Sequence, residues 1–148
     1  MSEHIVKSHN KNLLLYHLVC PAKYRKKIFT EEIEKTLKEV CRGIEERYEI
    51  IFLEIGADND HVHFLIQGVP SLAPYRIVQI IKTITSKEIK RRHEEVKKIL
   101  WGGAIWTSGY YMNTVGQYGN ESVIKQYVQK QGRENEYKKI HRSQLKLF

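Results

Sequence analysis

The segment 61–67 constrains the fold most, because it is an uncharged run in which two histidines alternate with apolar residues. In a β-strand, successive side chains point to opposite faces of the sheet. His61 and His63 therefore share one face, while Val62 and Phe64 fill the other. We predict a strand with one apolar face and with two imidazoles side by side on its other face.

Apolar periodicity places further elements on both sides of this strand. The turn at 58–60 predicts an antiparallel hairpin with the preceding strand. In chain order we predict a strand, a helix, two strands, a helix, a strand and a last helix. This order indicates an α+β fold of the ferredoxin-like split βαβ type, an antiparallel sheet backed by helices with an added C-terminal helix. The expected strands cover 13–19, 49–56, 61–67 and 105–115, and the helices cover 31–48, 74–90 and 121–131.

Length and composition fit one domain over residues 1–148, with flexible tails expected at 1–11 and 133–148. The N-terminus lacks the apolar core of a signal peptide, and no apolar run is long enough to cross a membrane. Cys20 and Cys41 fit no disulfide or zinc motif and are expected to be buried thiols. We therefore expect a cytoplasmic protein without a membrane partner.

The chain has 25 Lys and Arg against 17 Asp and Glu, a formal net charge of +8. A net positive charge of this size favours an anionic partner, most often nucleic acid. An ordinary solvated surface remains the alternative for each basic residue. The candidate DNA contacts are Lys23, Arg25, Lys26, Lys82, Lys87, Arg91, Lys130 and Arg133.

Two imidazoles on one strand face are the beginning of a metal site, although buried structural histidines would give the same pattern. His17 lies alone in an apolar run and is interpreted as structural. The other histidines lie in polar segments and are expected to be solvated; they are His4, His9, His93 and His141.

The predicted last helix carries Tyr127 and Gln131, which are four residues apart and so share a helix face. Tyr127 could simply pack on the sheet, but a buried Gln131 amide needs a polar partner, and a metal ion is one. A phenol has a pKa near 10, so as a nucleophile it needs activation or a polarised electrophile. The set His61, His63, Tyr127 and Gln131 therefore indicates metal-assisted phosphoryl transfer.

These motifs together resemble the small single-tyrosine (TnpA-type) transposases of insertion sequences, members of the HUH endonuclease superfamily. The name HUH describes a histidine, a hydrophobic residue and a histidine, as in 61–63. The similarity extends from about 13 to 132. It is carried in order by Tyr16-His17-Leu18-Val19 with Lys23-Tyr24-Arg25, by 60–66, by Leu100-Trp101-Gly102-Gly103 with 106–116, and by 124–131.

The resemblance implies that Tyr127 attacks a single-stranded DNA phosphate, giving a 5′-phosphotyrosine link and a 3′-hydroxyl. His61 and His63 would hold Mg²⁺ or Mn²⁺, with Gln131 as third ligand. The partners implied are single-stranded DNA with hairpins near the ends of the element and a second copy of the chain in a homodimer. The tyrosine helix of one subunit can then complete the metal site of the other.

Three other functions stay open at this point. A plasmid relaxase or rolling-circle initiator shares the chemistry, but such proteins are usually larger and often use two tyrosines or three histidines. A domesticated transposase would act on chromosomal hairpins. A non-catalytic hairpin-binding protein would bind DNA without forming a covalent adduct.

Overall fold

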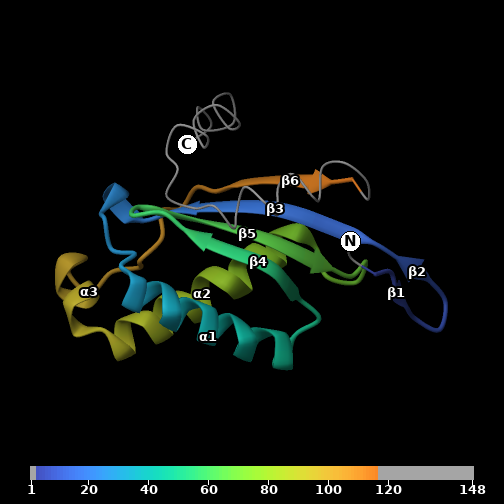
Figure 1. The fold of residues 1–148 in the computed structure, drawn as a ribbon, viewed down its shortest axis with the longest axis horizontal. Helices are drawn as coiled ribbons and strands as arrows, with labels where there is room; N and C mark the ends of the chain where they lie inside the picture. Colours follow the sequence, from blue (N-terminus) through green and yellow to red (C-terminus); the bar gives the residue numbers. More distant parts are fainter. Residues whose placement is uncertain (1–2, 117–148) are drawn as a thin grey trace.

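The structure is a computed structural model of the chain and describes residues 3–116. Its main body is a four-stranded sheet with helices packed on one face (Figure 1). The strands are β3 (Leu14–Pro21), β4 (Ile51–Ala57), β5 (His61–Gly68) and β6 (Tyr111–Val115). Their order is β4-β5-β3-β6, and every neighbouring pair is antiparallel.

This topology confirms the predicted α+β split βαβ fold, in which β5 and β3 are the central strands. The hairpin of β4 and β5 is present, with a register shift between Phe52 and Glu54. The helix expected over 121–131 lies outside the described residues, as does the tail expected at 133–148.

Helices α1 (Glu31–Arg47) and α2 (Pro74–Arg92) cover one face of the sheet (Figure 1). The N-terminus of α1 is capped by the Thr30 hydroxyl, which accepts a hydrogen bond from the Ile33 backbone N–H at 3.3 Å. The apolar residues of alternate strand positions and of the two helices form the main core. It includes Leu18, Leu37, Val62, Phe64, Ile66, Ile77 and Ile81.

The opposite face of the sheet carries His17, His61 and His63, and we call it the histidine face. Leu15 and Leu65 lie on it too and form a small second cluster with Val115. The alternation predicted for 61–67 is thus confirmed, because Val62 and Phe64 point into the main core on the helical side.

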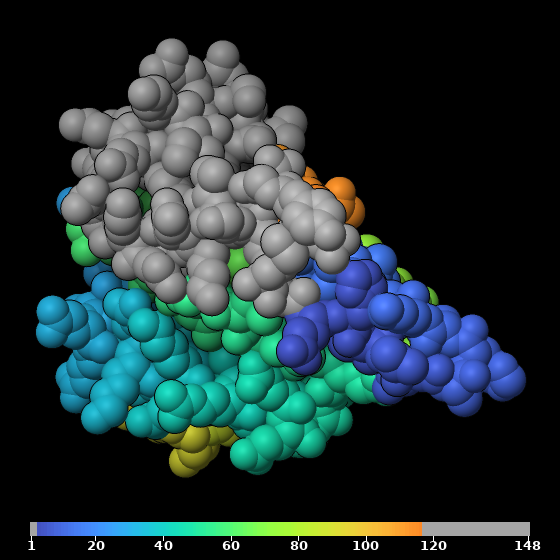
Figure 2. Space-filling view, turned by 45° about the vertical axis from the view of Figure 1, so that its right-hand side comes forward, coloured from blue at the N-terminus to red at the C-terminus, as the bar shows by residue number. Residues whose placement is uncertain are grey.

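Part of the N-terminal segment forms a two-stranded antiparallel sheet of β1 (Ile5–Val6) and β2 (Lys11–Asn12). It projects from one end of the molecule (Figure 2). Lys7 forms an ion pair with Glu49, and the Gln67 side chain donates to the Glu3 carbonyl at 2.8 Å. These contacts tie the segment 3–12 to the body, in contrast to the flexible tail expected over 1–11.

Two element predictions were wrong. The strand expected over 105–115 is regular only in β6, which covers Tyr111–Val115. Trp106 still forms an isolated antiparallel bridge with Ala22, and the carbonyls of Thr107 and Gly109 accept hydrogen bonds from the Lys82 ammonium. The charged stretch after α2 is a short helix, α3 (Glu94–Ile99), joined through His93. The turn after β3 is a short 3₁₀ helix, η1 (Lys23–Arg25).

The expectation that His93 is solvated was wrong, since it is buried and its Nε2 lies 2.7 Å from the Thr36 hydroxyl at the junction of α1 with α2. Cys20 and Cys41 are free and buried, as predicted. Among residues 3–116, no helix has both the length and the apolar character needed to cross a membrane.

Candidate functional site

The histidine pair of β5 lies at the end of the sheet where β3 and β5 meet the 58–60 turn. His61 and His63 are 4% and 0% exposed, and their ring centroids are 5.2 Å apart. Two buried imidazoles therefore lie side by side on one face of the sheet. The spacing predicted from strand alternation is therefore present in the fold.

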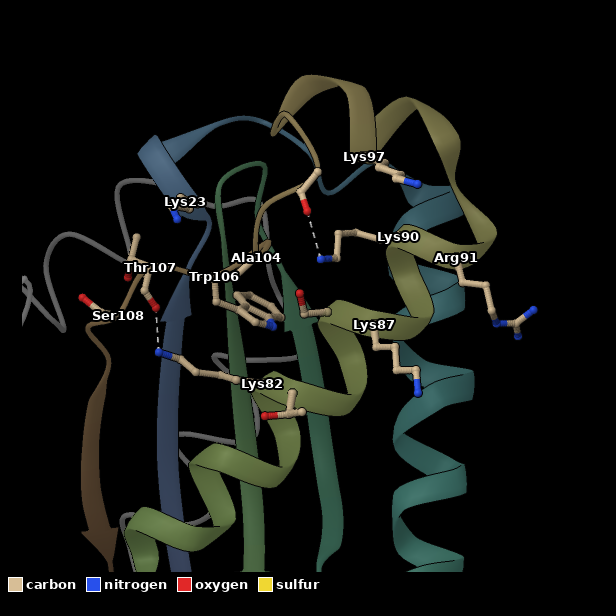
Figure 3. Close-up of a pocket in the computed structure, with 13 residues that line it drawn as sticks. Lys23, Lys82, Lys87, Lys90, Arg91, Lys97, Ala104, Trp106, Thr107 and Ser108 are labelled. Atoms are coloured by element: carbon tan, nitrogen blue, oxygen red, sulfur yellow. Dashed lines mark hydrogen bonds between the residues drawn. The ribbon is translucent and has the colours of Figure 1, made fainter.

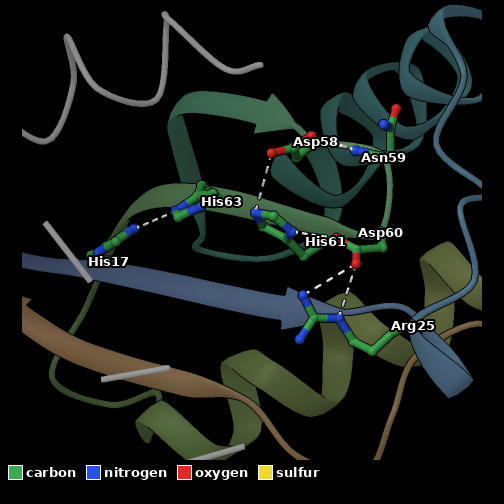
Figure 4. A network of polar contacts seen from close by, with 7 residues as sticks. All are labelled: His17, Arg25, Asp58, Asn59, Asp60, His61 and His63. Atoms are coloured by element: carbon green, nitrogen blue, oxygen red, sulfur yellow. Dashed lines mark hydrogen bonds and ion pairs between the residues drawn. The ribbon is translucent and has the colours of Figure 1, made fainter. Parts of the chain in front are cut away.

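The orientation of His61 is set by the turn that precedes it. Its Nδ1 lies 2.7 Å from Oδ1 of Asp60, and Asp60 Oδ2 lies 3.2 Å from both Nε and an NH2 nitrogen of Arg25 (Figure 4). Burial raises the pKa of Asp60, but the His61 hydrogen bond and the Arg25 charge outweigh it and hold that pKa below its ordinary value. An ionised carboxylate only accepts hydrogen bonds, so His61 Nδ1 carries the proton.

The orientation of His63 is set by His17 on the neighbouring strand. His17 Nε2 lies 2.9 Å from His63 Nδ1, and the two rings stack at 13° with centroids 5.1 Å apart (Figure 4). Both rings are buried, at 1% and 0% exposure. The interpretation of His17 as a structural histidine therefore misses its contact with the site.

The donor chemistry of this pair fits a divalent metal ion. In each ring Nδ1 is engaged by a neighbouring side chain, which makes Nε2 the nitrogen that would ligate a metal. A carboxylate behind a ligating imidazole, as Asp60 is behind His61, is the usual arrangement in metal sites. Within residues 3–116, no group of three or more His, Cys, Asp or Glu side chains is arranged to hold a metal ion. Gln131, the third ligand expected from the sequence, lies beyond residue 116.

Four of the predicted site residues fall beyond residue 116. Tyr127, Gln131, Lys130 and Arg133 lie outside the described residues, so their expected roles stay predictions. The described half of the expected site is the histidine pair with its supports, Asp60, Arg25 and His17.

A basic groove of about 840 Å³ lies between α2 and the 102–108 segment (Figure 3). Lys82 and Lys90 reach toward that segment, whereas Lys87 and Arg91 point away from it. The thirteen described lining residues include six cations and no acidic residue. These cations are Lys23, Lys82, Lys87, Lys90, Arg91 and Lys97.

The fold brings together four of the predicted basic residues, Lys23, Lys82, Lys87 and Arg91, along this groove. Lys82 is only half exposed, and burial lowers its pKa against an opposing effect of Cys20. Arg25 is paired with Asp60, and the exposed Lys26 does not line the groove.

Sequence reasoning missed four residues of these sites: His17, Asp60, Lys90 and Lys97. The position of His17 opposite the site depends on the pairing of Val19 with His63, which no local pattern specifies. Lys97 belongs to α3, which was not predicted.

The chain is similar in sequence to known transposases. Residues 10–131 match the family model described as "Transposase IS200 like". The ISDra2 transposase TnpA of Deinococcus radiodurans is 30% identical over 120 residues, which cover 80% of this chain and 84% of that protein. A transposase for insertion sequence element IS200 from Salmonella typhimurium is 27% identical over 116 residues, which cover 78% of this chain and 75% of that protein.

Two solved structures share the fold. A crystal structure of a Deinococcus radiodurans protein described as a transposase has a TM-score of 0.70 at 24% identity, covering 86% of this chain and 97% of that one. A REP-associated tyrosine transposase bound to a REP hairpin has a TM-score of 0.52 at 12% identity. The match covers 86% of this chain and 70% of that one. At these identities the likeness establishes the fold alone.

Proposed function

The chain belongs to the family of IS200-like transposases, and on this premise we propose that it cleaves and rejoins single-stranded DNA with a tyrosine nucleophile and a divalent metal ion. The observation that carries the proposal is the buried pair His61 and His63, with Nδ1 of each ring held by a neighbour. A hydrogen-bonded partner behind each imidazole is typical of metal-ligating histidines, because it fixes the tautomer and the orientation of the ring.

The proposed ligands are Nε2 of His61, Nε2 of His63 and the side-chain oxygen of Gln131. Nitrogen donors suit Mn²⁺ better than Mg²⁺, which prefers oxygen. When bound, the ion supplies Lewis-acid polarisation of the scissile phosphate. Asp60 and His17 keep the two rings in the required orientation.

The proposed nucleophile is the phenol oxygen of Tyr127. It attacks the phosphorus of a single-stranded phosphodiester, a bond to the 5′ phosphate forms, and the bond to the 3′ oxygen breaks. The departing oxygen leaves as a 3′-hydroxyl after taking up a proton, and the phenol loses its own. Attack of another 3′-hydroxyl on the phosphotyrosine reverses these changes and joins new strands without ATP.

The proposed substrate is DNA with hairpins at the ends of an insertion sequence. Six cations along one groove, without an acidic residue among its described lining, support binding of a phosphate backbone. The structural relative bound to a REP hairpin has the same fold. We further propose that the chain acts as a homodimer, as the family resemblance implies.

The test is a cleavage assay on labelled single-stranded oligonucleotides taken from the flanks of the gene. With Mn²⁺ present, the wild-type chain should cut one strand, and a chelator should stop the reaction. His61→Ala and His63→Ala should reduce cleavage by at least about two orders of magnitude, since each removes one of the proposed ligands. His9→Ala, at an exposed position, is the matched control and should cleave normally.

Unchanged cleavage in both ligand variants would contradict the metal site. Tight hairpin binding without cleavage under any metal would instead support the non-catalytic alternative.

A further inference from the structure

Two exposed aromatic side chains, Tyr24 of η1 and Trp101 after α3, meet at one corner of the molecule. Trp101 is 80% exposed and Tyr24 is 62% exposed, yet their ring centroids lie only 6.2 Å apart at an angle of 62°. We call this pair the aromatic corner. Large aromatic surfaces in contact with each other and with water are typical of binding sites, since folding alone would bury them.

The backbone at the aromatic corner is held in an unfavourable conformation. Tyr24, Arg25 and Trp101 have φ angles of 58°, 52° and 51°, and in the described part of the chain they are the non-glycine residues with positive φ. Side chains with a Cβ disfavour this region. Strained residues of this kind persist where the surrounding structure fixes them, and they cluster at functional sites.

Backbone hydrogen bonds fix both turns and join them to each other. Arg25 N–H donates to the Ala22 carbonyl at 2.9 Å, and Trp101 N–H donates to the Lys98 carbonyl at 3.2 Å. Lys23 N–H donates to the Ile105 carbonyl at 2.8 Å, so the turn at 23–25 is attached to the segment that follows Trp101. The backbones of Tyr24 and Trp101 are therefore held close to each other.

The aromatic corner lies at the rim of the basic groove. Lys23 and Gly102, the immediate neighbours of Tyr24 and Trp101, both line the groove. The Lys23 ammonium is 5.6 Å from the centre of the Tyr24 ring, and Lys90 reaches the Gly102 carbonyl at 3.4 Å. Cations beside flat apolar rings match a ligand that carries phosphates next to planar bases.

The aromatic corner is also connected to the histidine pair. Arg25, the residue after Tyr24, binds Asp60, which in turn holds His61. We propose that Tyr24 and Trp101 bind an unpaired nucleobase of single-stranded DNA whose phosphates lie along the groove. The inference rests on the proposed function and adds a base-stacking site at the rim of the groove. Stacking on aromatic rings accepts any base.

The test compares two single-stranded probes of equal charge: a twelve-nucleotide thymidine oligonucleotide and a twelve-unit abasic oligonucleotide. Trp101 and the buried Trp106 are the two tryptophans of the chain, so quenching of exposed tryptophan fluorescence reports on Trp101. The thymidine probe should quench the fluorescence and bind about ten-fold more tightly than the abasic probe. Fluorescence titration measures the quenching, and the anisotropy of a labelled probe measures the affinity.

Trp101→Gly and Tyr24→Gly should reduce this base-dependent preference, because each removes a ring. Glycine accepts positive φ, so both variants should melt at or above the wild-type temperature. Tyr75→Ala is the matched control, because Tyr75 is also 62% exposed and lies at the opposite end of α2 from Lys90. It should keep the preference.

Equal binding of both probes by the wild-type chain, or an unchanged preference in Trp101→Gly, would overturn the stacking site. A change of oligomeric state in Trp101→Gly with unchanged DNA binding would also overturn it, since the corner would then contact protein. Failure of the wild-type chain to bind either probe at low salt would contradict the proposed function itself.

Discussion

His17 and His63 join two neighbouring antiparallel strands through their rings, with His17 Nε2 2.9 Å from His63 Nδ1. The bond leads to a definite tautomer if His63 ligates a metal through Nε2. His63 Nδ1 must then carry the proton and donate it, and His17 Nε2 must accept it. His17 would therefore position a ligand without touching the metal.

We predict that His17→Leu weakens Mn²⁺ binding by about ten-fold, because residues behind metal ligands typically contribute ten- to hundred-fold in affinity. His17→Gln should recover much of this affinity, since its amide oxygen can reach the place of Nε2. His17→Asn is too short to do so. Electron paramagnetic resonance of free Mn²⁺ measures the affinity without requiring activity.

His9→Leu, at an exposed position, serves as the control for the His17 series. Equal Mn²⁺ affinities in the Leu, Gln and Asn variants would show that His17 only fills space.

The basic groove should dominate the salt dependence of DNA binding. We predict that the double variant Lys87→Ala/Lys90→Ala weakens binding of a hairpin oligonucleotide at low salt. The slope of log affinity against log salt should become shallower by about 0.7 to 0.9 for each phosphate that the variant no longer neutralises. Lys38→Ala on α1, outside the groove, should leave the slope unchanged. A wild-type slope near zero would contradict phosphate binding.

Cys20 should make stability depend on pH at the alkaline end. Burial raises the pKa of its thiol from 9.0 to about 12, although the Lys82 charge opposes the shift. The thiol is thus neutral in the folded chain while it ionises in the unfolded chain above pH 9. The contribution of the neutral Cys20 thiol to the free energy of unfolding is complete below pH 9 and is lost as the pH rises toward 12.

The stability difference between wild type and Cys20→Ala, measured by urea unfolding, should therefore shrink between pH 9 and pH 12. A difference that stayed constant over this range would show that the thiol is not shielded from water. Reaction with a thiol reagent at pH 8 should be slow until the chain unfolds.

Local periodicity was enough to predict the main elements. The strand around His61 and His63 and the apolar stripes of α1 and α2 each depend on near neighbours in sequence. The order of these elements then leaves few topologies, which is why the split βαβ sheet was predictable.

The failures came from long-range interactions. His17 reaches the site only through the pairing of β3 with β5, and His93 is buried only because α1 packs against α2. The strand expected over 105–115 is interrupted where Lys82 of α2 donates hydrogen bonds to the carbonyls of Thr107 and Gly109. Each depends on residues distant in sequence, which periodicity does not report.

The central claim is that Tyr127 forms a covalent link with DNA, and a denaturing gel tests it directly. The chain is incubated with Mn²⁺ and end-labelled single-stranded oligonucleotides from the flanks of its gene. We predict a shifted, protease-sensitive band that is absent in Tyr127→Phe and in His61→Ala and is kept in Tyr118→Phe. A band that persists in Tyr127→Phe would contradict the assigned nucleophile. The absence of any band despite hairpin binding would contradict the transposase chemistry.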